Sequence, residues 1–219
     1  MSARMMRTVA LAALAMGLVA QEARAQKLEG RALAEQMSYR FRDSTGSGQQ
    51  SGQMLGATLS LGLGQFRIGA AGAVGRMVDA DHAFAERELR TTLLSVGVEA
   101  ASWVEVGLEM QARREVMNDV VTLQRLAGPY GKAAFDFGGT GLQGLAELAL
   151  YPASSSSNTP PLQLALRAGI GARYQQNTGP LTVQLMYRFN RLDYKAEGGL
   201  DPSLTQDEAI SIEVGLRKF

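Results

Sequence analysis

The amino-acid sequence predicts an all-β protein, a closed antiparallel up-and-down barrel whose strands cross a membrane. The segment 162–191 contains two arms in which apolar residues alternate with polar or small ones, the pattern of a strand with one apolar face. Each arm has more than ten residues. That is longer than the usual globular strand of about five or six, and long enough to span a bilayer when tilted. The arms are joined by a short segment rich in turn residues, QQNTGP, which indicates a hairpin.

The N-terminal segment has the features of a cleaved signal peptide. Two arginines precede an apolar run of thirteen residues, Thr8 to Ala20, and Ala23 and Ala25 provide the small residues of a cleavage site. Thirteen residues are too few for a membrane-spanning helix, which argues against a retained anchor. We therefore divide the chain into a signal peptide (1–25), a periplasmic lead-in (26–35) and a transmembrane barrel (36–219).

Composition and charge exclude several classes of protein. The formal net charge is +1, so nothing indicates a nucleic-acid partner. The absence of cysteine excludes a disulfide framework and any thiolate metal site. No segment after the signal peptide is a long uninterrupted apolar run, which excludes a helical membrane protein. An exported protein of this kind is either periplasmic or a closed barrel in an outer membrane.

Alternation and turn residues divide the rest of the chain into ten predicted strands. They cover 37–42, 55–63, 66–74, 92–100, 104–112, 133–137, 142–151, 162–174, 181–191 and 210–217. The predicted long loops are 43–53, 78–88, 114–130, 152–160 and 193–207. All six prolines fall in predicted loops or turns, as expected because proline cannot donate to a strand ladder.

The number of strands depends on how residues 131–151 are divided. An exported single-chain barrel has an even number of strands. A turn at 138–141 gives ten strands and places every long loop on one side. The alternative of eight strands drops the first strand, fuses 131–151 and mixes long and short connections on both sides. We therefore favour ten.

Three features predict that the apolar face points outward into lipid. The apolar positions carry charge only near strand ends, at Arg76, Arg90 and Lys218. A charge at mid-bilayer would cost roughly 2–4 kcal/mol. The polar positions carry charges of both signs, predicted to face the lumen: Arg40, Arg67, Glu99, Glu105, Glu109, Arg113, Glu147, Arg167, Arg173, Arg188, Glu213 and Arg217. Aromatic residues lie near strand ends, as in interfacial girdles: Phe66, Trp103, Tyr151, Tyr174 and Phe189. A soluble calycin-like barrel is the alternative that meets the same alternation.

These features together resemble the small outer-membrane β-barrel proteins of the OmpA/OmpX-like superfamily, over residues 36–219. The resemblance implies location in a cell outer membrane, and it includes no catalytic motif. One departure concerns the terminal Phe219, which in that family is in phase with the apolar residues of the last strand. Here it shares parity with Glu213 and Arg217, which implies either a bulge before it or a weaker assembly signal.

No catalytic, cofactor-binding or metal-binding residue is predicted, and we expect a protein that is not an enzyme. His82 is the one histidine and lies among acidic residues (Asp79, Asp81, Glu86 and Glu88), which leaves a loop-borne hydrolase as an alternative. A solvated loop explains the same residues. The glycines of 69–75 lie within an alternating strand, so they do not form a dinucleotide-binding turn.

The expected function is a structural or surface-interaction role, with a lumen plugged by Arg/Glu ion pairs and long loops open to an extracellular ligand. Glu105 and Arg167 are a trial pair for this network. A small pore or transporter for small or hydrophobic solutes is the alternative. The expected partners are outer-membrane lipid and lipopolysaccharide, whose phosphates we expect Arg76 and Arg90 to contact.

Overall fold

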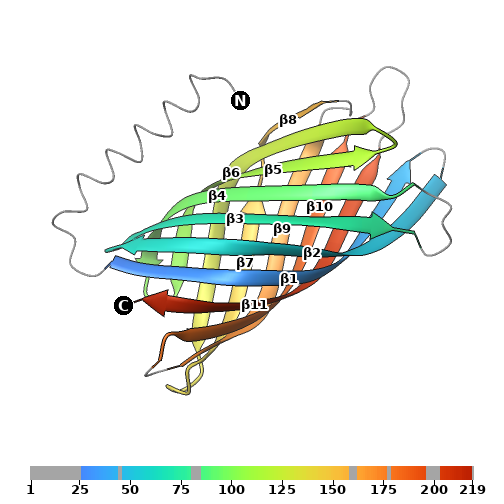
Figure 1. The fold of residues 1–219 in the computed structure, drawn as a ribbon. Helices are drawn as coiled ribbons and strands as arrows, with labels where there is room; N and C mark the ends of the chain where they lie inside the picture. The colour runs from blue at the N-terminus through green and yellow to red at the C-terminus, as the bar shows by residue number, and fades with distance from the viewer. Residues whose placement is uncertain are drawn as a thin grey trace.

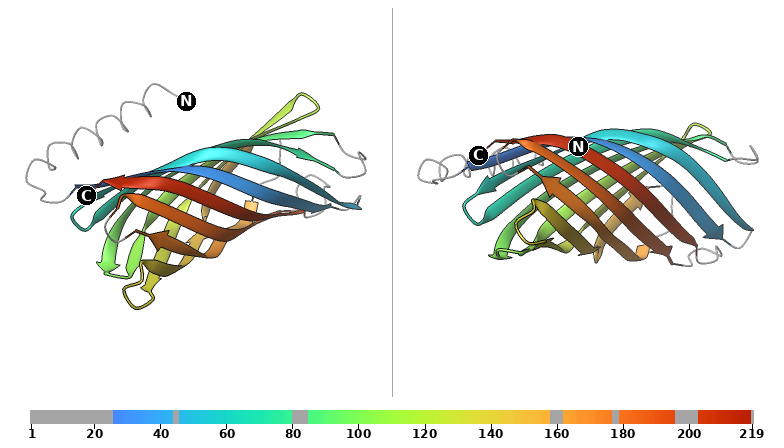
Figure 2. Two further views of the ribbon diagram at one scale, coloured as in Figure 1. Left: turned by 60° about the horizontal axis from the view of Figure 1, so that its bottom comes forward. Right: turned by 90° about the horizontal axis from the view of Figure 1, so that it is seen from below.

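The computed structural model describes residues 26–43, 46–79, 85–157, 162–176, 179–195 and 203–218, which fold as a closed antiparallel β-barrel with strongly tilted strands (Figures 1 and 2). The strands are β1 (Gln26–Asp43), β2 (Gly46–Leu63), β3 (Phe66–Val78), β4 (Arg87–Ala101), β5 (Val104–Met117), β6 (Val120–Asp136), β7 (Leu142–Leu150), β8 (Ala153–Ser157), β9 (Leu162–Gln175), β10 (Leu181–Tyr194) and β11 (Leu204–Lys218). The all-β fold predicted from the sequence is therefore confirmed.

The barrel has ten strand positions, and β1 and β11 close it. These two strands pair from Leu28 opposite Lys218 to Arg42 opposite Leu204. Every other strand pairs with its neighbour in the chain, except that β7 and β8 share the position between β6 and β9. Ten strands are thus confirmed and eight is wrong. The predicted turn at 138–141 is also confirmed, since β6 ends at Asp136 and β7 begins at Leu142.

Strand β1 corrects two predictions. The predicted lead-in, residues 26–35, lies in β1 and pairs along its length with β2 and β11. Within β1 it is Met37 and Tyr39 that point into the lumen and are buried, whereas Arg40 lies on the outer surface. The prediction had these faces reversed because it took 37–42 as the membrane-crossing part. The small and apolar outward residues of β1 are instead those from Leu28 to Ala34.

Three of the predicted long loops, 43–53, 114–130 and 152–160, lie largely in strands. The segment 114–130 is the clearest case, because β5 continues to Met117 and β6 begins at Val120. The residues between them, Asn118 and Asp119, have φ values of 49° and 62°. Two successive residues with positive φ form the type I′ turn that suits a two-residue hairpin. The loop predicted there is therefore wrong.

Pro129 lies in β6, so the prediction that every proline falls outside the strands is also wrong. On one side of it β6 pairs with β7, and on the other it pairs with β8. The opposing chain passes through Tyr151 and Pro152 at this point, where it belongs to neither strand. A proline is tolerated at such an irregularity because no ladder hydrogen bond requires its missing N–H.

The outer surface carries a belt of exposed apolar side chains, and among the described residues no outward-facing charge interrupts it. Its large members are Leu55, Leu59, Val74, Leu94, Val96, Val106, Leu108, Leu148, Leu150, Leu164, Ile170, Leu185, Ile210, Ile212, Val214 and Leu216. Within the described residues, no helix has the length and apolar character to cross a bilayer. We call this surface the apolar belt.

Exposed aromatic side chains mark one edge of the apolar belt. They lie at the end of the barrel that carries the short turns: Phe66, Trp103, Phe135, Phe137 and Tyr174. The rings of Trp103 and Phe135 are in contact, with centroids 5.7 Å apart. Tyr151 was predicted in such a girdle but is buried in the lumen. The long connections lie at the opposite end of the barrel from these aromatic side chains.

Candidate functional site: the barrel lumen

All but one of the charged side chains predicted to face the lumen do so, the exception being Arg40. They are Arg67, Glu99, Glu105, Glu109, Arg113, Glu147, Arg167, Arg173, Arg188, Glu213 and Arg217. In an antiparallel pair, two residues that lie opposite each other point to the same face of the sheet. Once the inward-facing residues of one strand are known, the pairing therefore identifies those of every other strand. The lumen therefore collects charges of both signs from most of the strands.

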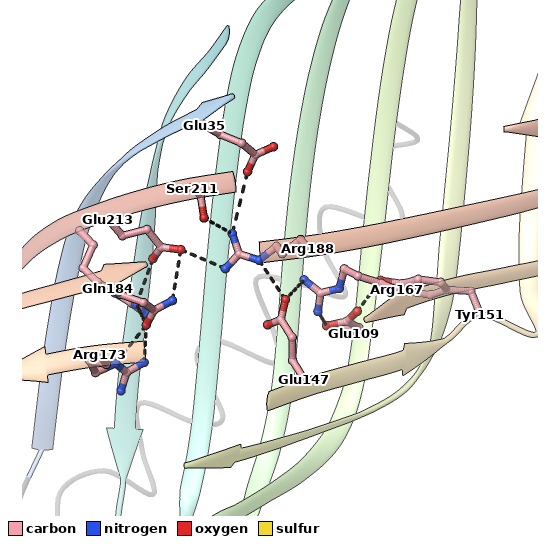
Figure 3. Close-up of polar contacts among 11 residues, drawn as sticks. Glu35, Glu109, Glu147, Tyr151, Arg167, Arg173, Gln184, Arg188, Ser211 and Glu213 are labelled. Atoms are coloured by element: carbon pink, nitrogen blue, oxygen red, sulfur yellow. Dashed lines mark hydrogen bonds and ion pairs between the residues drawn. The ribbon is translucent and has the colours of Figure 1, made fainter. Parts of the chain in front are cut away.

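The central network is a chain of ion pairs that runs across the lumen (Figure 3). Arg188 of β10 lies at its centre, 2.9 Å from Glu213 of β11 and 2.9 Å from Glu147 of β7. From Glu147 the chain continues to Arg167 of β9 at 3.8 Å, and Arg167 lies 2.6 Å from Glu109 of β5. These acidic side chains are nearly or fully buried. Each buried charge thus has an opposite charge close to it, which burial requires.

The network is also closely packed against the wall. An added Cβ at Gly169 would lie 2.8 Å from Cγ of Glu147, so only glycine leaves room for this carboxylate. At the far side of the lumen the Tyr151 hydroxyl donates a hydrogen bond to Glu109. Side chains of different strands therefore contact one another directly here.

Arginines continue the network toward the short-turn end. Arg31 of β1 lies 2.9 Å from Glu213, and its guanidinium also donates to Oε1 of Gln184 at 2.5 Å. Arg173 donates to the same oxygen through Nε at 3.0 Å and Nη2 at 2.9 Å. One amide oxygen thus accepts hydrogen bonds from two guanidinium groups.

A second charged cluster lies closer to the long-loop end. Arg113 of β5 forms ion pairs with Asp207 of β11 and, at 2.5 Å, with Glu115. Arg87 of β4 pairs with Glu115 at 2.7 Å and lies over the ring of Tyr39, 3.9 Å from its centroid. This combination of ion pairs and a cation–π contact fills the lumen between opposite walls.

An apolar layer occupies the lumen beside this cluster. It consists of Leu33, Met37, Met54, Ala73, Met77, Leu89 and Ala209, all buried, and it packs against Tyr39. Met77 and Leu89 have no exposed surface, and Met54 is 1% exposed. Unbranched methionine side chains fill irregular space well, so this layer leaves little room for water.

A cavity of about 380 Å³ lies on the other side of the apolar layer. Its lining extends from Ser102 and Trp103, in the turn between β4 and β5, to Met37 of the apolar layer. One wall is formed by small side chains of β2 and β3, among them Thr58, Ser60, Gly69 and Ala71, and the other by the central network. The cavity exists because β2 and β3 contribute mostly small side chains to this part of the lumen. The large charged side chains come mainly from the other strands.

The structure separates one pair that the sequence suggested. Glu105 accepts a hydrogen bond from Tyr130 and lies 3.7 Å from Lys132, whereas Arg167 contacts Glu109 and Glu147. Several network residues were missed altogether: Glu29, Arg31, Glu35, Arg87, Glu115 and Asp207. They lie in segments predicted as lead-in or loops. The alternation of charged residues with glycine and alanine in 28–35 could have revealed the first three.

The candidate residues for hydrolysis do not form a describable site. His82 and Asp81 lie outside the described residues, as do Phe219 and the predicted signal peptide. Of the neighbouring acids, Glu88 pairs with Arg90 at 2.7 Å. Among the described residues, no group of three or more histidine or acidic side chains is arranged to hold a metal ion. What the described lumen residues do show is close packing and charge pairing.

Comparisons with known proteins find similar solved structures but no related sequence. No family model matches the chain, and no curated protein does. The outer membrane protease OmpT from Escherichia coli matches 88% of this chain and 95% of its own, at 12% identity and a TM-score of 0.47. The translocator domain of the autotransporter NalP from Neisseria meningitidis matches 97% and 96%, at 11% identity and 0.46. The attachment invasion locus protein Ail of Yersinia pestis matches 87% and 98%, at 11% identity and 0.37.

The predicted resemblance to small outer-membrane β-barrels is confirmed at the level of architecture, by the closed ten-position barrel itself.

Proposed function

We propose that this protein is an exported outer-membrane barrel with a closed lumen and a structural or surface-interaction role. The observation that carries the proposal is a wall that is apolar outside combined with a lumen filled by paired charges and an apolar layer. An apolar belt of this kind is stable only against lipid or another apolar surface. Closure of the barrel satisfies the backbone hydrogen bonds that lipid cannot.

The closed lumen supports a role that does not depend on transport. An ion that crossed the barrel would have to pass the apolar layer and the cluster around Arg113, in which the buried charges already have partners. Displacing those partners would expose unpaired charge in a low-dielectric space. The exposed surface beyond the membrane, formed by the long strands and their connections, is then the part available to a ligand.

A small pore or transporter is the second candidate, and the cavity favours it. About 380 Å³ is enough for a small solute, and the lining offers hydroxyl, carboxylate and guanidinium groups. Transport would require the apolar layer to move, because that layer lies between the cavity and the long-loop end.

We expect no step conductance from the purified, folded protein in planar bilayers at neutral pH. The physical reason is the continuous obstruction by the apolar layer and the charged clusters. Reproducible conductance steps from the unmodified protein would instead establish the pore. Folding is checked beforehand by the altered gel mobility of unheated samples.

The variant Met54→Ser/Met77→Ser tests the apolar layer directly. Removing both side chains opens space for water within the layer, so we expect conductance steps that the parent lacks. Met110→Ser is the matched control, because Met110 has the outward parity of β5. If the double variant shows no more conductance steps than the control, the apolar layer does not close the lumen.

A further inference from the structure

Four outward-facing arginines lie together at the long-loop edge of the apolar belt. They come from four consecutive strands: Arg76 of β3, Arg90 of β4, Arg114 of β5 and Arg125 of β6. Arg90 and Arg114 are direct cross-strand partners, and Arg125 is opposite Ala112, two residues before Arg114. Arg76, Arg90 and Arg125 are exposed and Arg114 is half-buried. We call this set the arginine patch.

The arginine patch holds more positive charge than nearby acids neutralise. Glu88 pairs with Arg90 at 2.7 Å. Within the described residues, no ion pair joins Arg76, Arg114 or Arg125 to an acid. Like charges placed directly opposite on neighbouring strands are destabilising, so the Arg90–Arg114 pair is unfavourable in isolation. An anion supplied from outside would relieve that repulsion.

Two other arginines of the outer surface differ in this respect. Arg40 of β1 lies 3.4 Å from Glu208, and Arg191 of β10 lies 3.0 Å from Asp193. These two occupy the opposite side of the barrel, near the closure between β1 and β11. Arg42 of β1 is exposed on the same face as Arg40 and has no ion pair among the described residues. Within that part of the chain, however, only the side formed by β3–β6 places several such arginines on adjacent strands.

The arginine patch begins where the apolar belt ends. Along β3 the exposed apolar Val74 is followed on the same face by Arg76, and along β5 the outward Ala112 is followed by Arg114. The opposite edge of the belt is aromatic, with Phe66 and Trp103 exposed. A molecule bound across this boundary would place acyl chains on the belt and anionic groups on the arginines.

We propose that the arginine patch binds the phosphate groups of lipid A, the membrane anchor of lipopolysaccharide, with its acyl chains against the apolar belt. The proposal rests on the proposed outer-membrane location. Guanidinium suits a phosphate because its N–H groups form two parallel hydrogen bonds to phosphate oxygens. Several arginines on adjacent strands match a ligand that carries more than one phosphate. This assignment includes Arg114 and Arg125, which the sequence did not indicate.

The test compares binding of lipid A by the folded protein and by the variant Arg90→Gln/Arg114→Gln/Arg125→Gln. The probes are fluorescent lipid A, the same lipid with both phosphates removed, and inorganic phosphate, each titrated onto protein in detergent micelles. We expect the variant to bind lipid A on the order of tenfold more weakly than the parent. The dephosphorylated lipid should bind both proteins equally and weakly, and inorganic phosphate should not compete at millimolar concentration.

The matched control is Arg40→Gln/Arg191→Gln, which removes two outer-surface arginines that have acidic partners, and its affinity for lipid A should equal that of the parent. Equal affinity of the patch variant and the parent would overturn the proposal. So would tight binding of the dephosphorylated lipid to the parent, or competition by inorganic phosphate alone. Folding into lipid vesicles is measured separately, so failure of the outer-membrane location would appear there and not in these titrations.

Discussion

Leu59→Arg is expected to prevent most of the protein from folding into lipid vesicles, whereas Ser60→Arg should fold nearly as well as the parent. Leu59 is 52% exposed on the outer face at the middle of the apolar belt on β2. A guanidinium at mid-bilayer costs roughly 2–4 kcal/mol. Ser60 is its neighbour in the chain, points to the other face and lines the cavity.

The two variants form a matched pair because they introduce the same side chain at adjacent positions of one strand. An arginine at 60 would enter a cavity opposite Glu29, its cross-strand partner on β1, so we expect a cost below about 1 kcal/mol. The measurement is the folded fraction in vesicles across a urea titration, read from the mobility of unheated samples. Equal losses in the two variants would indicate that the outer face is not in lipid, and would favour a soluble barrel.

Removing Arg188 is expected to produce the largest loss of stability from a single change inside the lumen. Arg188→Met leaves the buried carboxylate of Glu35 without its ion-pair partner. It also removes the shared cation from Glu147 and Glu213, which then keep one arginine each, Arg167 at 3.8 Å and Arg31 at 2.9 Å. Breaking a buried ion pair from one side costs about 3–5 kcal/mol, because an uncompensated charge remains. Urea titration of the protein refolded in vesicles measures the loss. Arg191→Met is the control on the same strand, and its exposed ion pair with Asp193 should contribute less than about 1 kcal/mol.

A second variant distinguishes loss of charge pairing from loss of packing. Adding Glu35→Gln and Glu213→Gln to Arg188→Met removes two carboxylates that lose an ion pair with Arg188, while Glu147 keeps Arg167 at 3.8 Å. We therefore expect at least half of the lost stability to return. The remaining arginines keep acidic partners, since Arg167 still contacts Glu109 and Arg31 lies 3.4 Å from Glu29. A triple variant no more stable than Arg188→Met would mean that the central network stabilises the barrel through shape and not through charge.

Alternation predicted most of this structure because the strand period of two is a local property. It placed Arg188 and Glu213 in the lumen and Arg76 and Arg90 outside, and it gave the strand number. It failed in β1, where Glu29 and Arg31 made a membrane-crossing segment look like a polar leader. It also failed beyond the membrane, where both faces of a strand meet water and alternation weakens, as in 114–130.

The details of the lumen depend on contacts that no local pattern contains. The stagger of strands on opposite walls decides which glutamate lies beside Arg167. The sequence suggested Glu105, whereas the structure has Glu109 and Glu147 there. The sequence did not predict the apolar layer for the same reason. Met54, Met77 and Leu89 come from three adjacent strands, and they meet Ala209 of β11 only after closure.

The pairing of β1 with β11 also has a consequence for the folding rate. Leu28 pairs with Lys218, so the contact that completes the barrel joins residues nearly the whole chain apart. Three ion pairs cross the same boundary: Arg31 with Glu213, Arg40 with Glu208 and Glu35 with Arg188. Loop-closure entropy opposes such contacts until neighbouring hairpins have brought the ends together, and proteins of high contact order fold slowly. Until then the apolar belt and two strand edges are open to other chains, so protection from aggregation before insertion is a requirement of this topology.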